Sequence, residues 1–245
     1  MEVPQMALLE VNLDEDVAVL TMNSGENRFN PVFLESYLDT LDRLENETDA
    51  RTLVVTASHE KIFSNGLDLE WLVPVIMDQD IKTTKEFFYL LNRLFKRILL
   101  YPMITIAAVS GHAFAGGAIL SCAFDFRFMR SDRGFFCLPE IDLGIPLLPG
   151  MIALLTKAVP AYKFEEMQFT GKRLTAFECE KHHIITQACP MDALMETALS
   201  FAKNLNKKRD IVQIMKQRTY KHIVRALDVE DAEYIESGDF HIGSL

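Results

Sequence analysis

The chain has 245 residues, of which 49% are apolar and 24% are charged, the ordinary balance of a soluble globular protein. This composition excludes a disordered chain, a collagen-like repeat and a coiled coil. Asp and Glu outnumber Lys and Arg by 35 to 25, so the net charge is −10. We therefore expect no nucleic-acid partner, because general binding of phosphate backbones needs an excess of positive charge.

We expect no targeting or membrane-spanning segment. The first residues, MEVPQMALLE, lack the basic region and apolar run of a secretory signal, and no run of about 18 apolar residues occurs. The ending Gly243-Ser244-Leu245 lacks the basic residue of an S-K-L peroxisomal address. We expect a cytoplasmic protein, with the peroxisomal matrix as the alternative. Four cysteines without C-x-x-C spacing are expected to be reduced: Cys122, Cys137, Cys179 and Cys189.

Strand and helix patterns alternate along the first 140 residues. In chain order we first expect two strands within 7–22, a helix that Asn30 caps and Pro31 begins, a strand around 52–55 and a loop over 61–72. After these we expect a helix over 84–100, a strand over 104–109, a glycine-containing turn over 111–117 that opens a helix, and strands over 125–129 and 134–137. From Pro149 onward the patterns are mostly helical. The order indicates an α/β fold with a helical C-terminal region.

Several familiar catalytic motifs are absent from the sequence. The run from Gly111 to Gly117 has no Lys where a phosphate-binding P-loop needs one, and it lacks G-x-G-x-x-G spacing. No H-E-x-x-H occurs and His182-His183 stands alone, so we expect no metal site. Ser110 is not in a G-x-S-x-G elbow, which disfavours a serine hydrolase.

Two glycine-containing turns follow apolar strands, one at Ser64-Asn65-Gly66 and one at Gly116-Gly117. Glycines at such positions often only let a strand turn into a helix. The alternative is that free N–H groups at the two turns converge on an oxyanion. The spacing alone leaves both interpretations open.

Glu140 lies in the very apolar stretch FFCLPEIDLGIPLLPG. A carboxylate in such surroundings is paired, at the surface, or a base with a raised pKa. Asp142 is the competing acid, and on an extended segment it would point to the same side as Glu140.

Taken together, three ordered blocks resemble the crotonase (enoyl-CoA hydratase/isomerase) superfamily: IFSNGLDL (62–69), ITIAAVSGHAFAGGAILSCAFD (104–125) and PEIDLGIPLLPG (139–150). The resemblance implies a spiral of ββα units, an acyl-CoA thioester as the ligand, no separate cofactor, and a homotrimer or a dimer of trimers. It implies that the backbone N–H groups of Leu67 and Gly116 form an oxyanion hole for the thioester carbonyl.

One departure from the family pattern bears on the reaction. Hydratases of the family carry a glutamate two residues after the Gly-Gly pair and a second in the Pro-Glu block, but here these positions are Ile119 and Glu140. The chain most resembles the Δ3,Δ2-enoyl-CoA isomerases, in which Glu140 would be the catalytic proton shuttle. Another thioester reaction (hydration, hydrolysis or decarboxylation) and a non-catalytic acyl-CoA-binding protein remain as alternatives.

The resemblance also implies substrate contacts at Arg28, Lys61, Ser64, Gly66, Trp71, Phe114, Ile119 and Leu143. Lys207, Lys208 and Arg209 are further candidates for the CoA phosphates. We expect residues 1–190 to form the CoA-binding and catalytic core and residues 191–245 to form a helical oligomerisation region. Apolar stripes in that region (Leu194, Ala198 and Phe201; Ile211, Ile214 and Met215) are expected at or near the interface.

Overall fold

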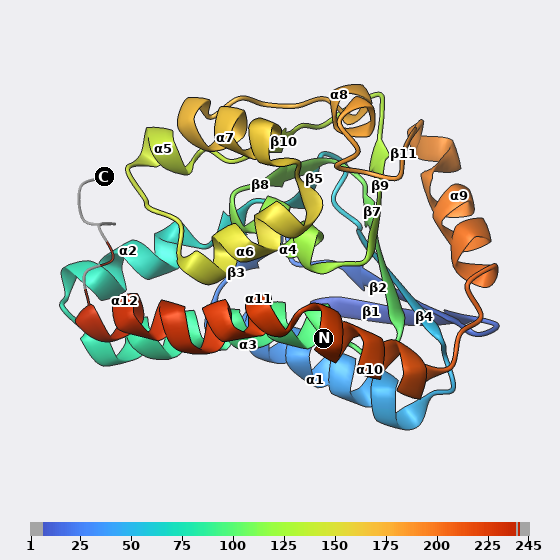
Figure 1. Cartoon of the computed structure of the whole chain (residues 1–245), viewed down its shortest axis with the longest axis horizontal. Coiled ribbons are helices and arrows are strands. Elements are labelled where there is room, and N and C mark those ends of the chain that lie inside the picture. Colours follow the sequence, from blue (N-terminus) through green and yellow to red (C-terminus); the bar gives the residue numbers. More distant parts are fainter. Residues whose placement is uncertain (1–6, 239, 241–245) are drawn as a thin grey trace, which may run out of the picture.

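A computed structural model of the chain describes residues 7–238 and residue 240 (Figure 1). The targeting candidates at the two ends lie partly or wholly outside these residues. The strands are β1 (Leu9–Asp14), β2 (Val17–Met22), β3 (Arg28–Phe29), β4 (Thr52–Ala57), β5 (Ile62–Ser64), β6 (Gly66–Leu67), β7 (Ile104–Val109), β8 (His112–Phe114), β9 (Phe126–Arg130), β10 (Phe136–Cys137) and β11 (Gln187–Cys189).

The helices connect the strands and then form the C-terminal part of the chain. They are α1 (Pro31–Glu47), α2 (Leu69–Met77), α3 (Ile81–Leu99), α4 (Gly116–Ala123), α5 (Glu140–Leu143), α6 (Pro149–Ala158), α7 (Ala161–Thr170), α8 (Ala176–Lys181), α9 (Met191–Lys203), α10 (Arg209–Thr219), α11 (Lys221–Arg225), a π-helical segment η1 (Ala226–Glu230) and α12 (Asp231–Ser237).

The strands are distributed between sheets in a repeating way. The large sheet has the order β1-β2-β4-β7-β9-β11, antiparallel only between β1 and β2. The small parallel sheet has the order β10-β8-β5. Each of the pairs β4/β5, β7/β8 and β9/β10 therefore gives its first strand to the large sheet and its second to the small one. This repetition confirms the expected α/β spiral of ββα units with a helical C-terminal region.

Both faces of the large sheet are covered, which explains the continuous apolar pattern of β4. Leu53 and Val55 belong to the main core beneath α1 and α3, whereas Val54 faces the second core formed with α9. Figure 1 shows α9 along one side of the sheet and α1 and α3 on the other. The main core continues under α4 and α6, so it extends from the sheet to the elements that carry the candidate site.

Several local expectations are confirmed. Asn30 caps α1, since its side chain accepts a hydrogen bond from the Phe33 N–H at 3.0 Å. All six residues of the predicted apolar stripe on α1 are buried: Phe33, Leu34, Tyr37, Leu38, Leu41 and Leu44.

Other local expectations are wrong. The expected loop over 61–72 contains β5, β6 and the start of α2, because β5 pairs with β8 and β6 pairs with β3. Residues 140–143 are a helical turn rather than an extended segment. The expected stripe on α9 does not face outward, since Leu194 and Ala198 pack against the large sheet.

Within the residues that the structure describes, no helix has both the length and the apolar character needed to cross a membrane.

Two buried tyrosines provide a test of the core. Tyr101 donates its hydroxyl to the Leu41 carbonyl at 2.7 Å, whereas the Tyr37 hydroxyl has no partner among the described residues. We predict that Tyr101→Phe lowers the free energy of unfolding by about 1 kcal/mol, and that Tyr37→Phe leaves it unchanged or raises it, because only Tyr101 loses a hydrogen bond. Urea unfolding measures both variants, and equal losses would contradict this description of the core.

Candidate active site

A cavity of about 880 Å³ opens between the helices on the side of the main core. Backbone and side chains from five regions line it: the β3–α2 region, α3, the end of β8 with the start of α4, the segment 139–151, and the end of the chain. The lining residues include Arg28, Asn65, Leu67, Leu69, Glu70, Phe88, Leu91, Phe114, Ala115, Gly116, Ile119, Pro139, Glu140, Leu143, Ile145, Leu148, Met151, Glu233, Tyr234 and Phe240. Most of these side chains are apolar, as in pockets that enclose small organic ligands.

The first wall of the cavity is the turn before α2. Ser64 is buried and braces this turn, because its hydroxyl donates to the Asn27 carbonyl at 2.7 Å and accepts from the Gly66 N–H at 3.1 Å. Gly66 has a φ of +74°, which favours glycine. The Asp68 N–H donates to the Phe29 carbonyl across the β3–β6 ladder. Since successive N–H groups of a strand point to opposite sides, the Leu67 N–H points away from β3.

The second wall is the N-terminus of α4. Ala115 precedes this helix with φ 50° and ψ −124°, a backbone conformation that a residue with a Cβ rarely adopts. Because Gly116 is the first residue of α4, its N–H has no acceptor in a preceding helical turn. The helix end thus presents a free donor and the positive end of its dipole to the cavity.

The two turns are in direct contact. A Cβ on Gly66 would overlap the Gly116 nitrogen, and a Cβ on Gly117 would overlap the Ser64 carbonyl group. Only glycine therefore lets the turn at 64–67 approach the start of α4 this closely. As a result, the N–H groups of Leu67 and Gly116 belong to neighbouring backbone segments of one cavity, as a pair of oxyanion donors requires.

Glu140 follows both of these segments in the sequence, and it lines the same cavity. It begins the short helix α5, its side chain is 8% exposed, and Oε2 has no hydrogen-bond partner among the described residues. Burial raises the pKa of Glu140 to about 7. A carboxyl group with this pKa both accepts and releases a proton readily near neutral pH.

The other carboxylates that line the cavity, unlike Glu140, are exposed. Glu70 is exposed and forms an ion pair with Arg28 at 2.7 Å, and Arg28 also pairs with Glu26. Glu233 is exposed at the end of the chain. Among the described residues that line the cavity, Glu140 is therefore the one buried carboxylate.

The structure brings seven of the sequence-predicted site residues to the cavity: Arg28, Leu67, Phe114, Gly116, Ile119, Glu140 and Leu143. Asp142 does not share the position of Glu140, because the helical turn of α5 directs it to the exposed side. Its expected orientation beside Glu140 is therefore wrong.

Four predicted contact residues do not line the cavity. Ser64 and Gly66 lie behind the first turn and shape it. Trp71 packs its ring against Phe87, with centroids 5.0 Å apart, and Lys61 is exposed before β5.

The basic cluster at 207–209 is also outside this cavity. Arg209 instead donates to the carbonyls of Glu45, Thr48 and Ala50 at the end of α1. Its role in the structure is thus to cap a helix.

Some cavity residues had no readable signal in the sequence. The strained backbone of Ala115 has no signal in a run of small residues, and Met151 has the pattern of an ordinary helix residue. Tyr234 and Phe240 come from the end of the chain, which sequence patterns placed in a separate helical region. No group of three or more His, Cys, Asp or Glu within the described part of the chain is arranged to hold a metal ion.

Comparison with known proteins agrees with this geometry. Residues 12–240 match the family described as enoyl-CoA hydratase/isomerase. The chain belongs to this family. The resemblance of the three glycine- and proline-containing blocks is thereby confirmed.

Individual members of the family carry different activities in their names. Enoyl-CoA delta isomerase 3 of Arabidopsis thaliana is 28% identical over 227 residues, which cover 87% of this chain and 92% of that protein. A carnitinyl-CoA dehydratase of Salmonella arizonae is 31% identical over 234 residues, which cover 94% of this chain and 83% of that protein.

Solved structures of other family members share the fold. An enoyl-CoA hydratase/isomerase family protein from Pseudomonas syringae aligns with a TM-score of 0.84 and 23% identity, covering 94% of this chain and 97% of that one. An enoyl-CoA hydratase from Bacillus halodurans aligns with a TM-score of 0.85 and 21% identity, covering 96% and 97%.

The raised pKa of Glu140 predicts a pH-dependent effect on stability. Because the folded protein favours the protonated form, this group contributes stability at low pH, and the contribution is lost as pH rises through about 7. We predict that Glu140→Gln is more stable than the unsubstituted protein at pH 8, by up to about 3 kcal/mol, and that the difference shrinks toward pH 5. Urea unfolding at the two pH values measures this difference.

Glu178 is the matched control, because hydrogen bonds from the Thr175 N–H and hydroxyl lower its pKa. This group contributes stability above its ordinary pKa of 4.5, so Glu178→Gln is expected to lose the same stability at pH 8 and at pH 5, and to lose less only at lower pH. A Glu140→Gln protein that is less stable than the unsubstituted one at pH 8 would contradict the desolvated state of Glu140.

Proposed function

We propose that the chain is an enoyl-CoA isomerase that converts a 3-enoyl-CoA into the trans-2-enoyl-CoA. The observation that carries this proposal is the single buried carboxylate of the cavity. Ile119, which is 1% exposed, stands where hydratases of the family carry a second glutamate. Adding water across a double bond needs two groups to hold and deprotonate the water, whereas moving one proton between two carbons needs only one.

In the proposed reaction, the Glu140 carboxylate removes a proton from C2 of the substrate. The electrons of the broken C2–H bond move into a dienolate, whose negative charge is greatest on the thioester oxygen. The same carboxylic acid then returns the proton to C4, which leaves the double bond between C2 and C3. No atom is gained or lost, so the reaction needs no co-reactant.

The backbone of the two glycine turns would lower the energy of the dienolate. The N–H groups of Leu67 and Gly116 would donate to the thioester oxygen, where negative charge develops. Removal of one such donor in other enzymes costs about 100-fold or more in rate. The surrounding side chains, Phe114, Ile119 and Leu143, exclude water and so strengthen these electrostatic contacts.

The names of the relatives support both this proposal and a second candidate. The similarity to enoyl-CoA delta isomerases favours isomerisation. The similarity to carnitinyl-CoA dehydratases, which extends over 94% of this chain, favours removal or addition of water on a CoA thioester. An assay that follows 3-enoyl-CoA isomerisation and 2-enoyl-CoA hydration separately discriminates the two. Hydration faster than isomerisation would overturn the isomerase proposal.

The role of Glu140 is tested by Glu140→Gln, which keeps the size of the side chain and removes its basicity. We predict that isomerase kcat falls at least about 100-fold, the usual contribution of a general acid–base group. The dissociation constant of the substrate is expected to change little, because the cavity walls are untouched.

Asp142→Asn is the matched control, since Asp142 is an acid on the same helical turn but is exposed. We expect it to keep most of the activity. Near-normal turnover in Glu140→Gln, or an equal loss in both variants, would refute the proposed mechanism.

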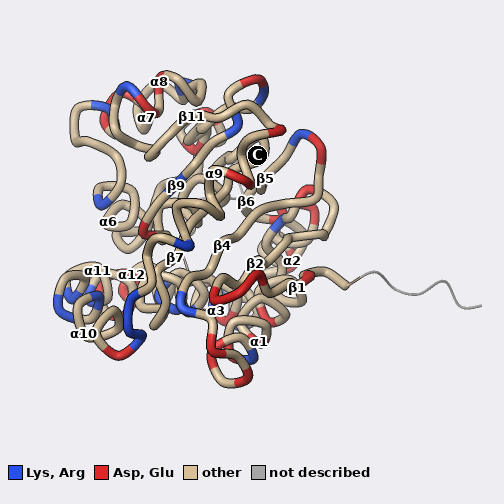
Figure 2. Tube along the Cα trace, turned by 90° about the vertical axis from the view of Figure 1, so that its right-hand side faces the viewer, with Lys and Arg blue, Asp and Glu red and all other residues tan. Residues whose placement is uncertain are grey.

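We also propose that the protein assembles as a trimer or a dimer of trimers. Ile211, Ile214 and Met215 of α10 are 50%, 43% and 63% exposed, so this part of the expected apolar stripe is left uncovered by the chain itself. Figure 2 shows that α10 and α11, the helices at this end of the chain, also carry Lys and Arg residues, as expected for the polar rim of an interface.

Light scattering at micromolar concentration measures the assembly. The expected result is a mass of three chains or a multiple of three. A mass of one chain would overturn the proposed assembly and would leave the catalytic proposal unaffected.

A further inference from the structure

The end of the chain forms one wall of the cavity. Tyr234 of α12 and Phe240 beyond it are both lining residues. The Phe240 ring stacks on Phe88 of α3, with centroids 4.6 Å apart and planes 10° from parallel. We call residues 233–238 together with residue 240 the C-terminal wall. Figure 1 shows α12 running beside α3.

A π-helical segment precedes this wall. Residues Ala226–Glu230 wind more loosely than the helices on either side, and the Asp231 N–H donates to the Ala226 carbonyl, five residues back. Single π-helical turns inside α-helices are frequently found at functional sites. Within this turn, the Leu227 carbonyl accepts a hydrogen bond from Asn92 Nδ2 of α3 at 3.1 Å.

Asp231 follows the π turn and is fully buried. Its Oδ1 accepts a hydrogen bond from the Gly150 N–H near the start of α6 at 2.7 Å, and its Oδ2 accepts one from Asn92 Nδ2 at 2.8 Å. A Cβ on Gly150 would lie 2.5 Å from Oδ2, so glycine is needed for this approach. One carboxylate therefore joins α12 to both α3 and α6.

No Lys or Arg of the described residues forms an ion pair with Asp231. The cations of α3 bind outside this cluster, Lys85 to Glu236 and Lys96 to Asp228, and Glu230 is a neighbouring negative charge. Burial raises the pKa of Asp231 to about 6. A buried carboxylate without a counter-charge costs stability, so its position calls for a role other than stabilising the fold.

Each partner of Asp231 lies next to the cavity. Asn92 follows the lining residue Leu91, and Gly150 precedes the lining residue Met151. Both groups that face Asp231 are donors, and the Asn92 amide is held in its orientation by the Leu227 carbonyl. Two acceptor oxygens, which a carboxylate offers and an amide does not, are thus required at residue 231.

Resting on the proposed function, we propose that Asp231 is a positioning residue that holds the C-terminal wall against α3 and α6 and thereby sets how tightly the cavity binds the apolar chain of an acyl-CoA. Displacement of the wall would separate Phe240 from Phe88 and open the apolar part of the cavity to water. It would leave Glu140 and the two glycine turns in place, because they belong to other elements.

The test compares the binding of octanoyl-CoA and acetyl-CoA, which do not isomerise, in Asp231→Asn and the unsubstituted protein. We expect the dissociation constant of octanoyl-CoA to rise roughly tenfold, because an amide leaves one donor facing another. The dissociation constant of acetyl-CoA is expected to stay within about twofold, because acetyl-CoA has no long chain to contact the wall. The kcat at saturating substrate is also expected to stay within about twofold. Titration calorimetry measures both ligands.

Asp228→Asn is the matched control, because Asp228 also joins the C-terminal helices to α3 but through an exposed ion pair with Lys96. It is expected to leave both dissociation constants unchanged. Phe240→Leu alters the wall without touching Asp231, and it should weaken octanoyl-CoA selectively in the same way. It also tests the wall directly if Asp231→Asn fails to fold.

Three results would overturn the inference: unchanged octanoyl-CoA binding in Asp231→Asn, equal weakening of both ligands in it, or unchanged octanoyl-CoA binding in Phe240→Leu. The proposed function is tested separately, by measuring thioester binding and isomerisation with the unsubstituted protein. If that protein binds octanoyl-CoA but does not isomerise 3-enoyl-CoA, the isomerase proposal fails while the role of Asp231 stands. If it binds neither thioester, both proposals are overturned.

Discussion

The close contact between the turn at Gly66 and the start of α4 at Gly116 governs the arrangement of the cavity. It exists because neither residue has a Cβ and because Ser64 holds the turn from below with two hydrogen bonds. The ββα spiral brings the two segments together, since β5 and β8 are neighbours in the small sheet. This contact places two backbone N–H donors beside one apolar space. The backbone supplies no group that can accept a proton from a substrate, so a side chain must supply it.

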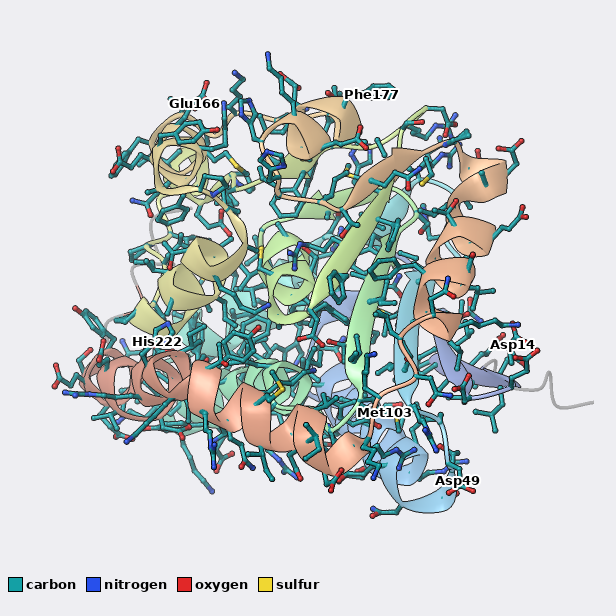
Figure 3. All side chains as sticks on the ribbon, turned by 45° about the vertical axis from the view of Figure 1, so that its right-hand side comes forward. Asp14, Asp49, Met103, Glu166, Phe177 and His222 are labelled. Atoms are coloured by element: carbon teal, nitrogen blue, oxygen red, sulfur yellow. The ribbon has the colours of Figure 1, made fainter. Side chains whose placement is uncertain are left out.

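Glu140 can be this proton acceptor because its carboxylate is not engaged in an ion pair. Among the described residues no cation forms an ion pair with it and its Oε2 lacks a hydrogen-bond partner, and burial raises its pKa to about 7. The buried Lys216 is different: it donates to the carbonyl of Met103, a residue labelled in Figure 3, at 2.8 Å and pairs with Asp125. Lys216 thus has an acceptor and a counter-charge, whereas Glu140 has no counter-charge and an unpartnered oxygen, which suits it to proton transfer.

Much of this arrangement could be predicted from the sequence. Local patterns indicate the apolar strands, the two glycine-containing turns and Glu140 in its apolar stretch, and the resemblance of three ordered blocks to one family indicates which of these residues form the site. Other features depend on distant contacts and carry no such signal. Trp71 turns to Phe87 rather than to the cavity, α5 coils into a single turn that separates Asp142 from Glu140, and Phe240 returns from the chain end to close a wall. Pairing between remote segments decides each of these cases.

The central claim is that one carboxylate moves protons between carbons and adds no water. Incubation of trans-2-enoyl-CoA with the protein in D₂O, followed by chromatographic separation and mass spectrometry of the CoA esters, tests this claim. Because Glu140 returns the hydrogen that it removes, the expected result is formation of the 3-enoyl isomer without a 3-hydroxyacyl-CoA, with deuterium entering the acyl chain only in those turnovers in which the Glu140 carboxyl exchanges with solvent. Accumulation of the 3-hydroxyacyl-CoA without formation of the 3-enoyl isomer would contradict it.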